Sequence, residues 1–253
     1  MLQLPPQDSV HWLTALLLNG ALISLAQRLP LLTRSGWIHA GVLGTLLWGT
    51  LGWPGWLAVV AYLALGSLVT RLGFRRKQSS GLAEARGGRR GPENVWGSAL
   101  VGTVLALATP AASAPWQQLL LLGFAASFAA KLADTCGSEI GKRWGRHTVL
   151  ITSLQAVAPG TEGAISLEGT AASLAGSTLM ALVMLALGVI SGWQAALWVT
   201  AVGLLATLLE SLIGATLQRR WHWLSNELVN GLQTFLAAAL AMIPTALGLI
   251  SLG

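Results

Sequence analysis

Long apolar stretches dominate this chain of 253 residues, and most of its charged residues lie in the connections between them. A stretch of about 17–25 apolar residues is long enough to cross the hydrocarbon core of a bilayer as an α-helix. Only 9% of the residues are charged, whereas a soluble domain carries about a quarter. The sequence therefore predicts an all-α, polytopic helical membrane protein with a single integral membrane domain over residues 1–253.

The apolar stretches predict about eight transmembrane helices. In chain order they are Trp12–Gln27, Gly36–Gly52, Pro54–Leu72, Asn94–Ala112, Trp116–Asp134, Glu168–Ile190, Trp193–Leu217 and Leu228–Leu252. The second is short and rich in glycine, so it is a candidate for a tilted or partly re-entrant segment. Small residues lie four apart in Gly41 and Thr45 and in Gly169 and Ser173, a spacing that is typical of close helix packing.

The N-terminal sequence MLQLPPQDSV has neither a basic segment nor a cleavage site of small residues. We therefore expect no signal peptide and a first span that is retained. Cys136 is the single cysteine, which excludes a disulfide framework and a multi-cysteine metal site within one chain. We expect Cys136 to be a small buried residue.

Lys and Arg alternate between connections in a way that predicts the orientation of the chain. They follow spans one, three, five and seven, at Arg28 and Arg34, from Arg71 to Arg90, at Lys142, Arg143 and Arg146, and at Arg219 and Arg220. The connections after spans two, four and six hold none. Because positive loops stay in the cytoplasm, both termini are expected on the non-cytoplasmic side. Topology explains the basic excess, so we expect no nucleic-acid partner.

The basic connection after the third span, RRKQSSGLAEARGGRRGPENVWGSAL, has two interpretations. In one it is a solvated loop held near anionic headgroups. In the other, glycines let the backbone approach a ligand while arginines donate to phosphate oxygens, and an acid and an amide open the next helix. The residues of this second interpretation are Arg86, Gly87, Gly88, Arg89, Arg90, Glu93 and Asn94.

The fifth span ends in an unusual charged sequence, KLADTCGSEIGKRWGR. Lys131 and Asp134 are three residues apart and share a helix face. Asp134 and Glu139 are five apart, so they converge only if the helix ends near Gly137. Two oxygen ligands plus substrate phosphates form the usual Mg²⁺ arrangement. The alternative is that Lys131 pairs with Asp134 while Glu139 lies at the interface beside Lys142.

Glu210 lies within the seventh span, nine residues before Arg219 and about 13 Å inside its cytoplasmic end. A carboxylate at that depth must pair, take a proton, line a polar cavity or bind a metal. Asn226 and Asn230 face the same way at the start of the last span, for helix contacts or for a ligand. The loop PGTEGAIS is rich in backbone donors, and its Glu162 is consistent with an interfacial acid.

Four motifs, taken in order, closely resemble the integral membrane family that includes phytyl-phosphate kinase and transmembrane protein 19. They are GLAEARGGRRGPENVWGSAL, ADTCGSEIG, ITSLQAVAPGTEGAISLEGTAASLAG and ESLIGATLQ. The resemblance implies phosphorylation of phytyl phosphate to phytyl diphosphate, a step in phytol salvage for tocopherol or phylloquinone synthesis. It also implies a distant similarity to polyprenol kinases, and therefore Mg²⁺ and CTP or another nucleoside triphosphate. The implied location is a bacterial inner membrane or a thylakoid membrane.

The positions that match the family, together with the neighbouring cation Lys131, indicate roles for individual residues. The catalytic residues would be Asp134, Lys131 and Arg89; the phosphate-binding residues Arg86, Gly87, Gly88, Arg90, Asn94, Ser138, Gly160, Thr161, Gly163 and Asn230; and the metal ligands Asp134, Glu139, Glu93 and Glu210. The chain departs from the family pattern at Cys136, where an aromatic residue is expected. It departs again at Glu162, where Asp or Asn is expected, and at Glu210, where Asp is expected.

Other function classes use similar residues. A lipid-linked cytidylyltransferase or phosphatase would need the same metal and phosphate groups but would release different products. A transporter of a phosphorylated or anionic solute is expected to place charge near the middle of the bilayer, often within inverted repeats. In this sequence the charge gathers toward one face, which favours the kinase, with a prenyl phosphate, a nucleoside triphosphate and the lipid bilayer as its partners.

Overall fold

The computed structural model of the protein describes residues 2–221 and 223–250, and most of these residues are helical. The helices are α1 (Ser9–Ala26), α2 (Arg34–Arg71), α3 (Phe74–Ser79), α4 (Pro92–Ala108), α5 (Ala114–Trp144), α6 (Leu167–Ala186), α7 (Trp193–Ile213) and α8 (Asn226–Ala246). Short turns η1 (Ala85–Gly88), η2 (Thr109–Ala111) and η3 (Gly214–Gln218) and a two-stranded hairpin, β1 (Val149–Leu150) with β2 (Ala164–Ile165), complete the fold.

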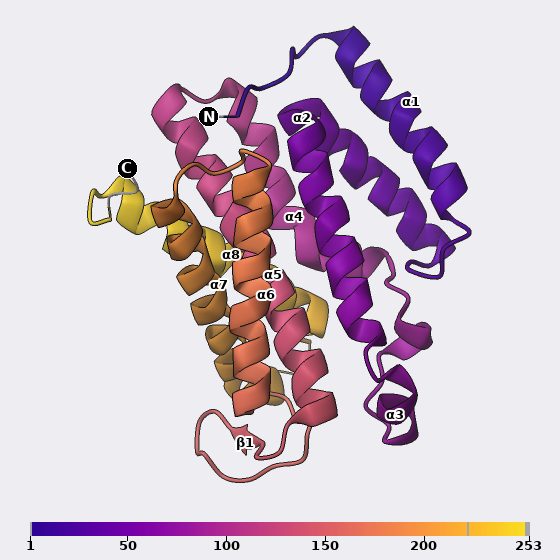
Figure 1. Ribbon diagram of the computed structural model, residues 1–253, viewed down its shortest axis with the longest axis vertical. Coiled ribbons are helices and arrows are strands. Elements are labelled where there is room, and N and C mark those ends of the chain that lie inside the picture. Colours follow the sequence, from indigo (N-terminus) through magenta and orange to yellow (C-terminus); the bar gives the residue numbers. More distant parts are fainter. Residues whose placement is uncertain (1, 222, 251–253) are drawn as a thin grey trace.

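Seven helices of the described residues are long and apolar enough to cross a membrane: α1, α2, α4, α5, α6, α7 and α8. This confirms the predicted all-α membrane architecture. The predicted number of spans differs only at α2, which takes up both the second and the third predicted span. Its backbone is non-helical at Gly52, with φ 70° and ψ −162°, and Pro54 follows within the helix. Figure 1 shows α2 as two arms that meet near its label. The number of membrane crossings stays a prediction.

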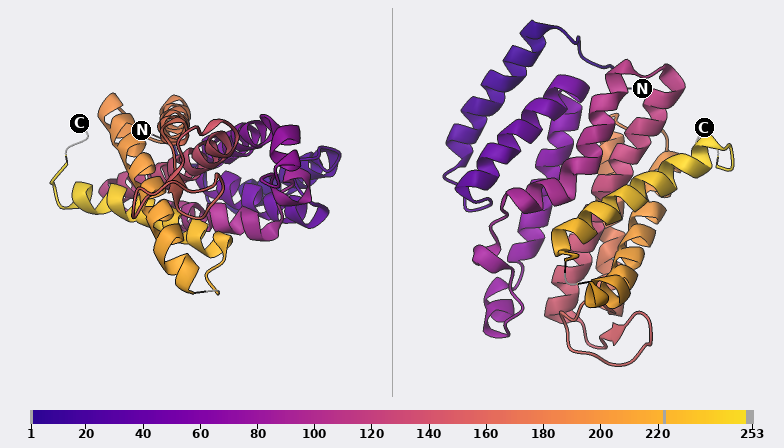
Figure 2. Two further views of the ribbon diagram at one scale, coloured as in Figure 1. Left: turned by 90° about the horizontal axis from the view of Figure 1, so that it is seen from below. Right: turned by 180° about the vertical axis from the view of Figure 1, so that it is seen from behind.

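Helix α5 forms the centre of the bundle and packs against α2, α4, α6, α7 and α8. Helix α6 covers one of its faces (Figure 1) and α8 crosses the opposite face (Figure 2). Lipid tails are as apolar as the side chains, so close packing rather than the hydrophobic effect must hold such helices together. Ala129 and Ala130 of α5 are fully buried, and the backbone there lies 3.2 Å from where a Cβ on Gly203 would stand.

The small residues four apart make the close contacts that their spacing predicts. A Cβ on Gly137 of α5 would lie 2.1 Å from Oγ of Ser173 and 3.2 Å from the carbonyl oxygen of Gly169, both in α6. A Cβ on Gly41 of α2 would lie 3.1 Å from the Ile23 side chain of α1. These glycines are therefore packing residues.

Asp134 and Glu139 would converge only if the helix ended near Gly137, and this condition is not met, because α5 continues without interruption to Trp144. Gly137 does not adopt the left-handed conformation that would end a helix. Its missing side chain instead lets α6 approach. Glu139 and Asp134 therefore stay on one continuous helix and diverge around its axis.

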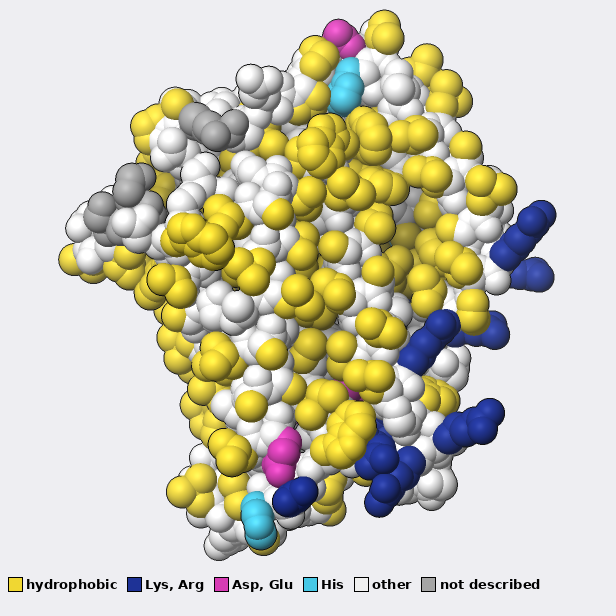
Figure 3. All heavy atoms as spheres, in the orientation of Figure 1, with side chains coloured by type: hydrophobic (Ala, Val, Ile, Leu, Met, Phe, Trp, Pro, Cys, Tyr) yellow, Lys and Arg dark blue, Asp and Glu magenta, His cyan; other side chains and the backbone are white. Residues whose placement is uncertain are grey.

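Charge is distributed unevenly along the molecule. The Lys and Arg side chains visible in Figure 3 lie along its right and lower edges, and the upper part of that face has none. Figure 1 shows α3 and the β1 hairpin at the lower end, and both chain ends near the upper end. This arrangement agrees with the predicted grouping of the basic loops on one side and both termini on the other, while the membrane face that each occupies stays a prediction.

Candidate active site

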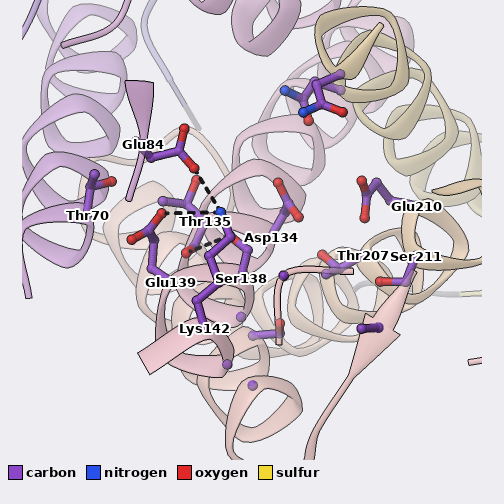
Figure 4. A pocket seen from close by; sticks show the side chains of 18 of the residues that line it. Thr70, Glu84, Asp134, Thr135, Ser138, Glu139, Lys142, Thr207, Glu210 and Ser211 are labelled. Atoms are coloured by element: carbon purple, nitrogen blue, oxygen red, sulfur yellow. Dashed lines mark hydrogen bonds and ion pairs between the residues drawn. The ribbon is translucent and has the colours of Figure 1, made fainter. Parts of the chain in front are cut away.

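A polar cavity of about 450 Å³, shown from close by in Figure 4, is lined in part by the basic connections of the chain. Its walls come from α2, α4, α5, α6, α7, α8, the η1 turn and the β1–β2 loop. Segments far apart in the sequence therefore meet around a single space.

Most of the residues selected from the sequence line this cavity. They are Arg86, Gly88, Arg89, Arg90, Asn94, Lys131, Asp134, Ser138, Glu139, Gly160, Thr161, Gly163, Glu210 and Asn230. Gly87 lies instead in a neighbouring hollow among arginines. Glu93 does not line the cavity and forms an ion pair with Arg86. Their roles in binding and catalysis stay predictions.

The η1 turn directs the arginines of the glycine-rich motif. Arg86, Gly87 and Gly88 all have left-handed backbones, with φ of 55°, 67° and 79°. Glycine adopts this conformation freely, whereas an arginine in it is strained and must be held by other contacts. Arg86 donates to Glu93 and, over 3.0 Å, to Oδ1 of Asn94. The turn thus folds back on the start of α4.

Asn94 links three parts of the site. Its Oδ1 accepts a hydrogen bond from the backbone N–H of Gly91 over 2.9 Å and so caps α4. Its Nδ2 donates to Glu227 of α8 over 3.3 Å. A single amide therefore holds the arginine loop, the start of α4 and the start of α8 together.

Lys131 is a buried cation in the middle of the bundle, with 5% of its surface exposed. Its ammonium forms an ion pair with Asp134, as their shared helix face predicts, and donates to Oδ1 of Asn230 over 2.7 Å. Asn226 and Asn230 both line the cavity, as their spacing of four residues predicts. Lys131 is therefore held from two helices.

A second buried pair joins α3 to α5. Lys77 is 1% exposed, forms an ion pair with Glu139 and donates to the carbonyl oxygen of Thr70 over 2.8 Å. Beside it, Lys142 donates to Glu84 over 3.0 Å and lies 3.9 Å from Glu139. The predicted neighbours Glu139 and Lys142 are therefore confirmed, but the main partner of Glu139 is Lys77.

Two acids of the loops have shifted pKa values. Burial would raise the pKa of Glu84, but Lys142, through charge and a hydrogen bond, outweighs it and lowers that pKa. Burial is the largest influence on Glu162 and raises its pKa; the charge of Lys142 opposes this, and repulsion by Asp134 and Glu84 adds to it. One loop thus favours an ionised carboxylate and the other a protonated one.

The chain matches the family described as integral membrane protein DUF92 over residues 17–238. It belongs to that family. The matched region includes every residue selected for the site, and an integral membrane family agrees with the apolar helices of the fold.

This DUF92 protein is similar in sequence to three known proteins. An uncharacterized membrane protein of Synechocystis is 51% identical over 91% of this chain and 90% of its own. Protein VTE6, chloroplastic, of Arabidopsis thaliana is 42% identical over 84% of this chain and 65% of its own. An uncharacterized membrane protein of Methanocaldococcus jannaschii is 28% identical over 92% and 94%. No solved structure matches the chain.

These relatives agree with the predicted location. The protein is an integral membrane protein, and a cyanobacterial and a chloroplast relative fit a bacterial or thylakoid membrane. The match to the chloroplast protein also agrees with the resemblance to the phytyl-phosphate kinase family that the motifs indicate.

The acids of this DUF92 cavity fit a metal only together with a ligand. Within residues 2–221 and 223–250, no group of three or more His, Cys, Asp and Glu could hold a metal ion. Mg²⁺ usually takes one or two carboxylates and completes its shell with water and phosphate oxygens. Asp134 and Glu210 both direct their carboxylates into the space shown in Figure 4. Asp134 is paired with Lys131 and its side chain is 18% exposed, whereas Glu139 is paired with Lys77 and is 3% exposed, so Glu139 is less available.

Glu84 and Lys77 were not predicted as residues of this region, and Lys142 was predicted only as a neighbour of Glu139. Glu84 is an acid within an otherwise basic loop, a contrast that could have drawn attention to it. Lys142 lies one helical turn after Glu139 on α5, but the sequence analysis assigned it to the positive connection after the fifth span. Lys77 stands in a run of basic residues, and nothing local distinguishes it from the two arginines before it.

Proposed function

We propose that the protein is a prenyl-phosphate kinase that transfers the γ-phosphoryl group of a nucleoside triphosphate to phytyl phosphate. One observation carries the proposal: a cavity at one end of an apolar bundle combines buried cations with several carboxylates. Arginine and lysine neutralise phosphates, while carboxylates hold a metal on the triphosphate, so a phosphotransferase needs both signs of charge in one place.

Roles follow from position. Arg86 and Arg89 lie on the exposed η1 side of the cavity and would bind the triphosphate. Lys131, held by Asp134 and Asn230, would neutralise the phosphoryl group in transfer. Asp134 and Glu210 would hold Mg²⁺, which would offset the negative charge of the phosphates. Gly160, Thr161 and Gly163 would add backbone donors from the β1–β2 loop.

The reaction needs no strong general base. An oxygen of the acceptor phosphate is already anionic and forms the new bond to the γ-phosphorus, while the bond from that phosphorus to the β–γ bridging oxygen breaks and a nucleoside diphosphate leaves. Positioning and charge stabilisation supply most of the catalysis in such transfers. A cavity without a nucleophile motif therefore suits the reaction.

The proposal of phytyl phosphate as the acceptor rests on the family resemblance. The resemblance implies phytyl phosphate as acceptor, with the diphosphate used for tocopherol or phylloquinone synthesis. A chloroplast relative at 42% identity supports this choice. The twenty-carbon tail of phytyl phosphate would stay in the bilayer while its phosphate reaches the cavity.

Product analysis tests the proposal. Detergent-purified protein receives Mg²⁺, phytyl phosphate and CTP or ATP labelled in the γ-phosphate, and in parallel the same nucleotide labelled in the α-phosphate. We expect γ-label in phytyl diphosphate and no α-label in lipid. Asp134→Asn should remove the transfer. Asp8→Asn is the matched control, because Asp8 accepts a hydrogen bond from His11 N–H at the start of α1 and does not line the cavity.

The other products distinguish the rival functions. α-Label in the lipid would indicate a cytidylyltransferase, and phosphate released from phytyl diphosphate would indicate a phosphatase. Folded protein that transfers label from neither nucleotide to phytyl phosphate would contradict the kinase.

A further inference from the structure

Arg90 points away from the other arginines of its loop. Its backbone is clamped to the connection between α1 and α2: its N–H donates to the carbonyl oxygen of Leu31 over 3.1 Å, and its carbonyl oxygen accepts from Thr33 N–H over 3.0 Å. Arg86 and Arg89 are exposed, whereas Arg90 is half-buried. The clamp therefore turns one guanidinium of the motif inward, toward α2.

The guanidinium of Arg90 lies in a place shaped for it. Its Cζ is 5.2 Å from the centre of the Tyr62 ring, a distance suited to a cation–π contact. Gly66, one turn further along α2, leaves the room, because a Cβ there would lie 2.6 Å from Nη2 of Arg90. Tyr62 and Gly66 thus fix the position of the charge.

No carboxylate is in direct contact with this arginine, although the charge of Glu84 acts on it from a greater distance. Nη1 of Arg90 is buried and has no hydrogen-bond partner, and in the described part of the chain no carboxylate forms an ion pair with Arg90. An unpaired buried donor is costly, and a guanidinium stacked on a ring still presents its N–H edge to an anion. Arg90 lines the cavity, so that edge is within reach of a ligand.

Tyr62 supplies a second unused donor. It is the single tyrosine of the chain, is 5% exposed, and packs against Phe128 of α5 with ring centres 5.7 Å apart. Tyr62 lines the cavity, and none of the hydrogen bonds found among residues 2–221 and 223–250 includes its hydroxyl, on which the charge of Lys131 acts. A buried tyrosine hydroxyl usually has a partner. A ligand in the cavity would provide one.

We propose that Arg90 and Tyr62 form the subsite for the acceptor, a lipid phosphomonoester, separate from the subsite for the nucleotide. This assignment rests on the proposed function. A forked guanidinium matches phosphate oxygens, and a neutral hydroxyl adds a donor without more charge. Gly66 is a positioning residue, because it acts only through the place of the guanidinium.

The depth of Tyr62 and Gly66 within the span favours a lipid phosphate over a nucleotide as the ligand of this subsite. Tyr62 and Gly66 lie in the second arm of α2, nine and five residues before Arg71 at its end. At about 1.5 Å per residue these positions are roughly 13 Å and 8 Å inside the span. A phosphate that is tethered to a tail in the bilayer can approach from that depth, whereas a nucleotide must arrive from water, where Arg86 and Arg89 are exposed.

Binding in detergent tests the subsite without requiring turnover. The melting temperature of the purified protein is followed with phytyl phosphate, phytol, inorganic phosphate or CTP with Mg²⁺. We expect phytyl phosphate to stabilise the wild type at far lower concentration than phytol or inorganic phosphate. Apparent affinity for phytyl phosphate should fall about 10- to 100-fold in Arg90→Lys and about 3- to 10-fold in Tyr62→Phe, the usual costs of a charged and a neutral hydrogen bond.

Two further variants make the assignment specific. Gly66→Val keeps every polar group but displaces the guanidinium, so it should also weaken phytyl phosphate about 10-fold, as loss of the Arg90 contact requires. Arg89→Lys should weaken CTP and leave phytyl phosphate unchanged. In the transfer reaction the same split should appear as a raised KM for phytyl phosphate in Arg90→Lys and Tyr62→Phe, with the KM for the nucleotide unchanged.

The outcomes separate this proposal from the kinase. If phytyl phosphate binds in the expected way but no label is transferred, the subsite stands and the kinase falls. If Tyr62→Phe and Arg90→Lys weaken CTP and not phytyl phosphate, the subsite belongs to the nucleotide and the proposal is overturned. Stabilisation by phytol equal to that by phytyl phosphate, or its persistence in both variants, overturns it as well.

Discussion

The two halves of α5 are buried in the same bundle but are built differently. Residues 121–130, LLGFAASFAA, are all buried and are apolar or small. Residues 131–144, KLADTCGSEIGKRW, include five charged residues, yet Lys131 and Glu139 among them are also buried. The first half packs against small and aromatic side chains, such as Gly102 of α4 beside Phe128. The second half faces the cavity.

The two halves show that a membrane helix tolerates charged residues where other segments supply partners for them. Lys131 has Asn230 of α8 beside it, and Glu139 has Lys77 of α3, in each case from a segment far away in the sequence. An intramembrane charge is costly unless another element supplies its partner. Substitutions in the first half of α5 should therefore change stability alone, whereas substitutions in the second half should change stability and also what the cavity binds.

The largest effect is expected where one partner of a buried pair is removed. Lys77→Met leaves Glu139 buried without its cation, which should cost about 3–5 kcal/mol of stability. The measurement is the midpoint of unfolding by denaturant in detergent. The double variant Lys77→Met with Glu139→Met removes both charges and should recover most of the loss. A double variant as unstable as the single one would show that the ion pair is not what Lys77 provides.

The next largest effect is expected on phosphoryl transfer when the charge of Lys131 in the cavity is removed. Lys131→Gln keeps a polar side chain but removes the cation, and phosphoryl transfer should fall by about 100-fold or more, as for the loss of one electrostatic stabiliser in other active sites. Ser127→Ala, one turn earlier on α5, is the matched control. Ser127 is fully buried, donates to the carbonyl oxygen of Phe124 over 2.7 Å and does not line the cavity. Equal losses in both variants would contradict the division of α5.

In the apolar half a smaller effect on stability is expected, with no effect on binding. A Cβ on Gly102 would lie 2.7 Å from the fully buried ring of Phe128, so Gly102→Leu overpacks the contact of α4 with α5 at a cost of about 1–3 kcal/mol. Gly20→Leu on α1 meets open space and should cost nothing. The KM values of folded Gly102→Leu should equal those of the wild type. A changed KM would show that the apolar half of α5 also affects binding in the cavity.

Much of the fold could be predicted from local patterns. Apolar stretches predicted α1 and α4 to α8, and small residues four apart predicted the contact of Gly169 and Ser173 with α5. Whether the helix ends near Gly137 could not be predicted, because a glycine looks the same in sequence whether it ends a helix or admits a neighbour. The break in α2 at Gly52 was indicated, since two spans were expected there.

The motifs of the candidate site could be predicted from the sequence, but the pairs that its side chains form with distant residues could not. The glycine-rich loop, Asp134 and Glu210 were found because charge is rare in such a chain. Lys77 and Tyr62 were missed, because their importance comes from Glu139 and Arg90, which lie 62 and 28 residues further along the chain. Tyr62 had one local sign, as the single tyrosine beside twelve tryptophans.

The smallest effects distinguish two loop acids at the mouth of the cavity. Glu84 has a pKa below its usual range, since Lys142 outweighs the effect of burial, so its stabilisation is complete above about pH 4.3 and is lost as pH falls through the lowered value. Its side chain is 49% exposed, and salt screens such a pair, so the effect is small. Glu84→Gln should therefore melt slightly below the wild type at pH 7, and the difference should disappear as pH falls through the lowered pKa of Glu84.

Glu162 should respond in the opposite sense. Burial raises its pKa, so the ionised form destabilises the folded protein as pH rises above the usual value, and this effect is absent in acid. Glu162→Gln should melt slightly above the wild type at pH 7 and equal it near pH 3. Melting curves of both variants across that range measure the two signs together. If the melting temperatures of both variants shift in the same direction at pH 7, Lys142 does not give the two carboxylates opposite effects on stability.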